Sequence, residues 1–140
     1  MKHINIIPPI RGADVHGSGA YLAPRGERKH NGIDLSCVSG SLIQAVCAGK
    51  VTKIGYPYRP NDPKKGHLRY VEIKDSLGYK ARYFYINPTI WVNTLIREGM
   101  VIGVAQDLTT IYKGITPHIH FEVKDPDGDF IDPDEYVKMV

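Results

Sequence analysis

Hydrophobic and polar residues alternate along five short stretches of the chain. These stretches span residues 49–55, 69–75, 80–86, 100–105 and 118–125. Successive side chains of a β-strand point to opposite faces, so a period of two predicts strands with one buried face. Fourteen glycines and ten prolines interrupt the chain, which favours short strands and turns over long helices. We therefore expect an all-β, mainly antiparallel domain of about seven to nine strands.

The segments between these stretches have the composition of loops and turns. Residues 58–66 form a polar loop with prolines, and residues 87–99 form a second connection that contains Trp91. The acidic segment 125–129 reads DPDGD, which predicts a turn. It lacks the complete ligand pattern of a calcium-binding loop, so the turn is the preferred interpretation. Asp134 is placed to cap a short C-terminal helix.

The composition is that of an ordinary globular domain. The chain has 140 residues, of which 42% are hydrophobic and 24% are charged, and this length suits a single domain over residues 1–140. The net charge of +3 comes from basic residues that are scattered rather than clustered, so no nucleic-acid partner is expected. A weak positive field would favour the approach of an anionic polymer.

Membrane and export signals are weak in this sequence. No stretch is long and apolar enough to cross a membrane, so we expect no stable membrane insertion. The apolar run near the N-terminus is broken by Pro8 and Pro9 and followed by Arg11, so we expect no signal peptide. The chain would then stay in a cytoplasm or leave it by another route. Cys37 and Cys47 are accordingly expected to be reduced and largely buried, with a disulfide, or a ligand or nucleophile role for Cys37, as the alternatives.

Two clusters of potential metal ligands stand out, HNGID at residues 30–34 and HIH at residues 118–120. His118 and His120 share one face if the second cluster lies on a strand, and the intervening Ile119 then faces the core. Gly32 disfavours a helix in the first cluster. On a strand that is entered through a turn near Gly32, His30 and Asp34 also share a face.

Two histidines and one carboxylate are a common ligand set for a hydrolytic zinc ion, which keeps its fourth position open. One ring of the HIH pair would bind the metal while the other reaches the water in the open position. The alternative is that these histidines only form a polar strand face. His3, His16 and His67 are expected at the surface, and His16 lies in a glycine-rich segment that is placed to fold over the metal.

The chain resembles the lysostaphin/LytM-type zinc endopeptidases, which cleave peptide bonds in bacterial peptidoglycan. The resemblance rests on HNGID, LSCVSGSLIQAVCAGKVTKIG, REGMVIGVAQD and PHIHFEV, and it covers about residues 17–133. It implies an antiparallel β core with an open groove walled by loops. By position in the motifs, His30, Asp34 and His120 would bind one Zn²⁺ ion, and His118 would be the catalytic base.

One element departs from that family's pattern. The family usually carries a second catalytic histidine in a Tyr-x-His-Leu element, and Tyr85 stands at that position here. A vertebrate relative, the leukocyte cell-derived chemotaxin, has a similar FYI element and is known as a signalling protein. Two hypotheses follow: a peptidoglycan endopeptidase in which the Tyr85 hydroxyl stabilises the oxyanion, or a zinc-containing peptide- or receptor-binding module without turnover. A closed structural zinc site is less favoured, because Cys37 lies off the shared face.

Two further expectations complete this interpretation. Glu122 lies on the same strand face as His120, so it is either the hydrogen-bond partner that orients a metal ligand or a solvated carboxylate. The short chain also resembles phage or prophage endolysins, which are antimicrobial wall-degrading enzymes. Such a protein would wait in the host cytoplasm for a holin-type pore, or travel in a virion tail.

Overall fold

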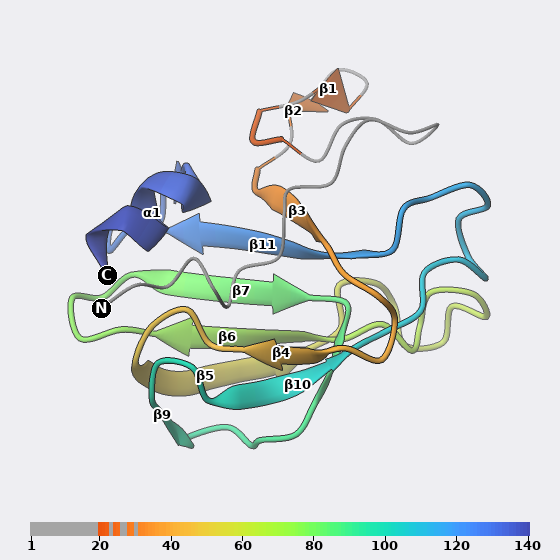
Figure 1. Cartoon of the computed structure of the whole chain (residues 1–140). Coiled ribbons are helices and arrows are strands. Elements are labelled where there is room, and N and C mark those ends of the chain that lie inside the picture. Colours follow the sequence, from red (N-terminus) through yellow and green to blue (C-terminus); the bar gives the residue numbers. More distant parts are fainter. Residues whose placement is uncertain (1–19, 23, 26–27, 30) are drawn as a thin grey trace.

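The computed structural model describes residues 20–22, 24–25, 28–29 and 31–140, and within these ranges it contains twelve strands and one helix (Figure 1). The strands are β1 (Pro24–Arg25), β2 (Arg28–Lys29), β3 (Ile33–Ser36), β4 (Leu42–Gln44), β5 (Gly49–Gly55), β6 (Tyr70–Lys74), β7 (Lys80–Phe84), β8 (Ile86–Pro88), β9 (Leu95–Ile96), β10 (Val101–Ala105), β11 (His118–Lys124) and β12 (Phe130–Ile131). The helix α1 spans Pro133–Met139. The expected antiparallel all-β fold is confirmed. The strand count exceeds seven to nine because strands of two or three residues leave no alternation in the sequence.

Three sheets make up the described fold. The largest has the order β12-β11-β7-β6-β5-β9, and β3 pairs with the free part of β11 beside β12. A second sheet has the order β4-β10-β8, and β1 pairs only with β2. All of these pairings are antiparallel. Figure 1 shows β4 and β10 in front of the central strands, so the two larger sheets pack face to face.

The hydrophobic core lies on one face of the large sheet, and β11 shows how the alternation positions it. Ile119, Phe121 and Val123 are at most 1% exposed and belong to the core cluster. The residues between them point to the opposite face, where His118 and Glu122 are buried and His120 is half-buried. One strand therefore contributes an apolar row to the core and a polar row to the other face.

The C-terminal helix begins two residues earlier than expected. Asp132, rather than Asp134, is its N-cap, and its side chain accepts a hydrogen bond from the Asp134 amide. Pro133 follows at the first helical position, where its missing N–H is not needed. The DPDGD segment is the expected turn, in which the Asp125 carboxylate accepts backbone hydrogen bonds at 3.0 Å from residues 127 and 129.

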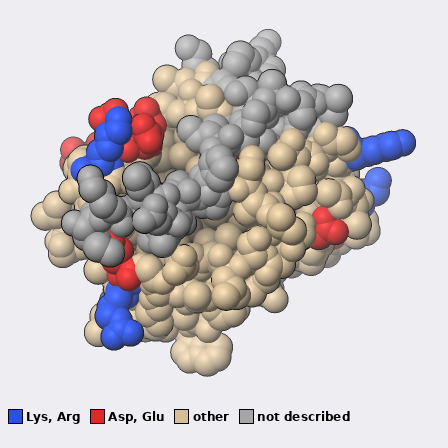
Figure 2. Space-filling model, in the orientation of Figure 1, with Lys and Arg blue, Asp and Glu red and all other residues tan. Residues whose placement is uncertain are grey.

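Several expectations about surface and cysteines can be compared with the structure. No helix among the described residues is long and apolar enough to cross a membrane. On the face in Figure 2, the described basic side chains lie at separate points rather than in one continuous patch. Cys47 is buried and Cys37 is half-buried, and both thiols are free. The Cys47 sulfur lies 3.0 Å from the Tyr136 hydroxyl, and burial raises the pKa of both thiols, which suits a structural role.

One buried hydroxyl joins the large sheet to the connection between β4 and β5 and gives a stability prediction. The Tyr83 hydroxyl on β7 accepts a hydrogen bond from the Val46 amide at 3.0 Å, and Tyr83 is 1% exposed. Tyr83→Phe leaves that amide unsatisfied, so we expect it to lower the free energy of unfolding by about 1–3 kcal/mol. Urea denaturation measures the change. Tyr79→Phe is the control because no described hydrogen bond involves its hydroxyl, and equal losses in both variants would contradict the prediction.

Candidate metal and catalytic site

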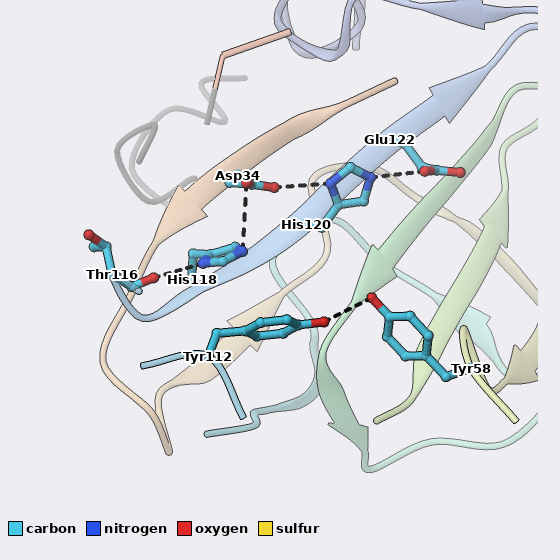
Figure 3. Close-up of polar contacts among 7 residues, drawn as sticks. All are labelled: Asp34, Tyr58, Tyr112, Thr116, His118, His120 and Glu122. Atoms are coloured by element: carbon cyan, nitrogen blue, oxygen red, sulfur yellow. Dashed lines mark hydrogen bonds and ion pairs between the residues drawn. The ribbon is translucent and has the colours of Figure 1, made fainter. Parts of the chain in front are cut away.

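The site forms where β3 pairs with β11. In this register Asp34 lies opposite His120, and Ser36 lies opposite His118. His118 and His120 are two residues apart on β11, so both rings point to the face away from the core. Figure 3 shows the Asp34 carboxylate between these two rings. The structure thus brings together three of the residues that were expected at the site.

The local sequence of the first cluster makes this close approach possible. Ile33 and Leu35 are 3% and 2% exposed, so they anchor β3 in the core and turn Asp34 to the opposite face. A Cβ atom on Gly32 would meet the Phe121 carbonyl and come within 3.0 Å of the His120 ring. Only glycine therefore fits beside this ring, and Gly32 directly precedes the strand, as the sequence predicted. His30, the third predicted ligand, lies outside the described residues, as do His3 and His16.

His120 lies between two carboxylates. Its Nδ1 is 3.0 Å from Asp34 Oδ1, and its Nε2 is 2.9 Å from Glu122 Oε1. Carboxylates only accept hydrogen bonds, so the ring satisfies both contacts as an imidazolium. Burial alone would lower the pKa of His120, but the hydrogen bonds and charges of Asp34 and Glu122 outweigh it and raise the pKa. Glu122 is 8% exposed, so the partner interpretation agrees with the structure better than the solvated one.

The same geometry fits a zinc ion in place of the Nδ1 proton. Two ligand atoms of a tetrahedral zinc ion lie about 3.3 Å apart, and Asp34 Oδ1 and His120 Nδ1 are 3.0 Å apart. Glu122 would then hold the Nε2 proton, as carboxylates commonly do behind a ligating histidine. The described residues by themselves form no group of three metal ligands. They supply two of the three predicted ligands, and the third is His30.

His118 is held in a defined orientation beside Asp34. Its Nδ1 donates a hydrogen bond to the Thr116 carbonyl at 2.7 Å (Figure 3). In the neutral ring this contact places the ring's N–H on Nδ1, so Nε2 carries the basic lone pair. Nε2 points to the Asp34 carboxylate, 3.6 Å from Oδ2. His118 therefore presents a base on the side where a metal held by Asp34 would lie.

Tyr85 reaches the site through an unusual backbone conformation. Its φ of 70° lies in the left-handed region, which is costly for a bulky residue, and β7 ends just before it at Phe84. In a regular strand, Phe84 and Tyr85 would face opposite sides. Here the Phe84 ring packs edge-on against His120 and the Tyr85 ring against His118, with centroids 5.1 and 5.8 Å apart. The strain thus brings both aromatic rings to the histidines.

Two tyrosines that were not expected at the site support the Tyr85 hydroxyl. Tyr58 hydrogen-bonds to Tyr85, and its hydroxyl lies 3.2 Å from that of Tyr112 (Figure 3). The Lys65 ammonium lies 5.0 and 5.2 Å from the ring centroids of Tyr58 and Tyr112. Burial, with smaller contributions from Tyr58, Tyr112 and Asp34, raises the Tyr85 pKa well above its usual value. Tyr85 therefore stays a neutral hydrogen-bond donor at ordinary pH.

Comparison with solved structures identifies the fold. The catalytic domain of lysostaphin, an antimicrobial peptidase from Staphylococcus simulans, matches with a TM-score of 0.68 and 20% identity, covering 87% of this chain and 90% of that one. A zinc-containing peptidase from Vibrio cholerae matches with a TM-score of 0.64 and 24% identity, over 89% of this chain and 37% of the other. The chain therefore has the lysostaphin-type peptidase fold.

The family follows from the sequence match. The model of peptidase family M23 matches residues 28–133, and the chain belongs to this family. Peptidases of this family are typically zinc-dependent metalloendopeptidases. The leukocyte cell-derived chemotaxin-2 of Mus musculus is 33% identical over 128 residues, which are 91% of this chain and 79% of that protein. The Bos taurus protein of the same name is 32% identical over the same shares.

The contact between His120 and Glu122 gives a metal-binding prediction. Glu122→Gln removes the negative charge behind the ring of His120, the predicted ligand, so we expect zinc affinity to fall about ten-fold or more. Competition with a chelating dye measures this without any substrate. Glu135→Gln makes the same charge change on α1, where the side chain is 67% exposed, and should leave zinc affinity unchanged. Unchanged affinity in Glu122→Gln would show that Glu122 does not tune the metal site.

Proposed function

We propose that this protein is a zinc-dependent endopeptidase that hydrolyses peptide bonds of bacterial peptidoglycan. The observation that carries the proposal is the β3–β11 register, which gathers Asp34, His118 and His120 on one face. Membership of peptidase family M23 supports the reaction class at the family level. The chain shares its fold with the antimicrobial peptidase lysostaphin, which supports a bacterial wall substrate. The net charge of +3 would aid the approach to an anionic wall.

The metal would be held by His30, Asp34 and His120. When bound, a zinc ion supplies Lewis-acid polarisation of the scissile carbonyl and lowers the pKa of water at the site. The chain's own contribution is to fix two ligands by strand pairing and to orient His120 through Glu122. Burial of the Asp34 side chain, which is 5% exposed, strengthens electrostatic interactions at this position.

The proton transfers are assigned to His118. Its Nε2 accepts a proton from the attacking water, and the resulting imidazolium donates a proton to the departing amine. The Thr116 carbonyl keeps the Nδ1 proton in place and steadies the ring. Asp34 Oδ2, 3.6 Å from Nε2, stabilises the positive charge that the ring carries between the two transfers.

Tyr85 is assigned to the developing oxyanion. Its raised pKa keeps the phenol protonated, so the hydroxyl can donate a hydrogen bond to the negative oxygen. Tyr58 hydrogen-bonds to the hydroxyl when no substrate is present, and Tyr112 in turn hydrogen-bonds to Tyr58. At the position where the family usually has a histidine, Tyr85 would thus supply a phenol hydroxyl as the hydrogen-bond donor.

The function is tested by His118→Ala. Removal of the base should lower the release of new free amino groups from purified peptidoglycan by about 10²–10⁴-fold, because general-base catalysis contributes rate increases of that size. Zinc content, measured on the same samples, should stay at the wild-type value because His118 is not a ligand. Undiminished cleavage by a zinc-loaded His118→Ala protein would exclude this assignment.

The role of Tyr85 is tested by a pair of variants. Tyr85→Phe removes the hydroxyl and keeps the ring against His118, so kcat should fall about 10²-fold with little change in KM. Tyr85→His restores the donor that the family usually has at this position and should recover activity. Tyr58→Phe, which removes only the supporting hydroxyl, should have a smaller effect. If Tyr85→Phe keeps the wild-type kcat, the oxyanion assignment is wrong.

Tyr85 also motivates the second candidate, a zinc-containing peptide- or receptor-binding module without turnover. The relatives from Mus musculus and Bos taurus are named as chemotaxins, and the chain covers 79% of each of them. This candidate predicts peptide binding by the zinc-loaded wild type with no release of amino groups from any wall chemistry. Phage or prophage origin, delivery through a holin-type pore or a virion tail, and a cytoplasmic or virion location stay predictions from the sequence.

A further inference from the structure

A recess lies close to Tyr85 of the proposed active site. It has a volume of about 380 Å³ and is formed by the loop between β5 and β6 together with β8. Its lining includes the polar side chains of Tyr56, Asp62, His67, Arg69 and Asn87. A recess of this size is large enough for a small organic group or the end of a peptide.

Arg69 is the group in this recess whose hydrogen bonds are incomplete. Its Nε atom is buried and has no hydrogen-bond partner, and no described carboxylate lies within ion-pair distance of the guanidinium. The guanidinium carbon stacks over the Tyr56 ring, 4.4 Å from its centroid. Arginine cannot lose its proton in a protein, so a buried N–H without an acceptor is costly. The Tyr56 ring packs against the Arg69 guanidinium but offers its N–H groups no strong hydrogen-bond acceptor.

The one carboxylate that lines the recess is already engaged. Asp62 Oδ1 accepts hydrogen bonds from the backbone amides of Lys64 and Lys65, each at 2.9 Å. These contacts hold the pKa of Asp62 below its usual value, so it remains charged. Asp62 therefore stabilises the loop, and the Nε–H of Arg69 is left without an acceptor among the described residues.

The loop fixes the position of Arg69 before any ligand binds. A Cβ atom on Gly66 would approach the Asp62 carbonyl to 2.6 Å, so the loop closes tightly on a residue without a side chain. The Gln106 side chain accepts from the Arg69 amide at 2.9 Å and donates to the His67 carbonyl at 2.8 Å. These contacts fix the backbone of Arg69, and stacking on Tyr56 orients its guanidinium, so an anion can bind without a large cost in conformational entropy.

The loop that lines the recess contacts Tyr85 of the proposed site. The Arg69 carbonyl accepts a hydrogen bond from the Tyr85 amide at 2.7 Å. Tyr58, from the same loop, hydrogen-bonds to the Tyr85 side chain. Asn87 lines the recess and follows Tyr85 by two residues. The recess is therefore a neighbour of the Tyr85 side of the proposed site.

We propose that this recess is a subsite that binds a carboxylate of the peptide substrate through Arg69. The planar guanidinium matches a carboxylate with two parallel hydrogen bonds, and Tyr56 holds its plane. The inference rests on the proposed function for the identity of the ligand, a wall peptide with a free carboxylate. It assigns Arg69 as a residue that determines specificity and gives it no part in the chemical step.

The test compares two probes that differ only at the carboxylate. Nα,Nε-diacetyl-L-Lys-D-Ala-D-Ala and its C-terminal amide are titrated into the ¹⁵N-labelled, zinc-loaded protein, and NMR shifts give both dissociation constants. The free acid should bind at least about ten-fold more tightly than the amide, and the Arg69 Nε–H signal should move only with the acid. Inorganic phosphate is titrated separately as a simple oxyanion.

Variants of Arg69 decide whether the preference comes from this residue. Arg69→Gln should bind acid and amide equally, whereas Arg69→Lys, which keeps the charge without the fork, should retain part of the preference. Arg97→Gln is the control because Arg97 is exposed and does not line the recess. It follows β9, which pairs with the start of β5, whereas the loop that forms the recess follows the end of β5. The amide spectrum of each variant shows whether its fold is intact.

The outcomes separate this inference from the proposed function. Equal binding of acid and amide by the wild type, an unchanged preference in folded Arg69→Gln, or phosphate binding at Arg69 without any preference between the two peptides would overturn the subsite. Cleavage of peptidoglycan without a carboxylate preference would leave the endopeptidase standing and remove the subsite. Selective binding of the acid through Arg69 without cleavage would keep the subsite and favour the binding module.

Discussion

The register between β3 and β11 is the constraint on which the rest of the site depends. A shift of one residue would turn the polar row of β11 into the core and its apolar row to the surface. Ile33 and Leu35 on one strand and Ile119 and Phe121 on the other are nearly fully buried, so core packing opposes such a shift. The free energy that fixes the site therefore comes from hydrophobic residues that never touch a substrate. Asp34 lies opposite His120 because Ile33 and Leu35 on either side of it are buried in the core, which turns Asp34 to the other face of the sheet.

The strained backbone at Tyr85 is the second feature that determines the geometry of the site. It occurs where the chain leaves the large sheet after β7 and enters the second sheet as β8. The Arg69 carbonyl accepts the Tyr85 amide and Gln106 donates its own amide to the Tyr85 carbonyl, at 2.7 and 2.8 Å. A backbone held from both sides can maintain a positive φ that a bulky residue would otherwise avoid. The position of the Tyr85 hydroxyl is thus determined by the same crossing that joins the two sheets.

The sequence predicted those parts of the site that follow from local periodicity. Alternation placed His118 and His120 on one face and also indicated Glu122, because all three lie on one strand. It could not predict the break at Tyr85, because the break depends on hydrogen-bond partners that are distant in the sequence. Tyr58 was missed because a polar loop with prolines has no hydrophobic period that could place its side chains. Arg69 was missed because it begins an alternating stretch, in which it reads as an ordinary polar strand residue, and its contact with Tyr56 is tertiary. The helix cap moved from Asp134 to Asp132 because Pro133 suits the first helical turn.

Tyr85 and the Arg69 recess are physically connected, because the Tyr85 amide donates a hydrogen bond to the Arg69 carbonyl. A phenol is a weaker donor to an oxyanion than an imidazolium, so a site with Tyr85 gains less from charge stabilisation in the transition state. Binding energy from remote parts of a substrate can instead position the scissile bond, and positioning also accelerates reactions. The loop that presents Arg69 also carries Tyr58, which hydrogen-bonds to Tyr85. Occupation of the recess would therefore act on the same loop that supports the catalytic hydroxyl, which joins recognition of the substrate to the group that replaces the usual histidine.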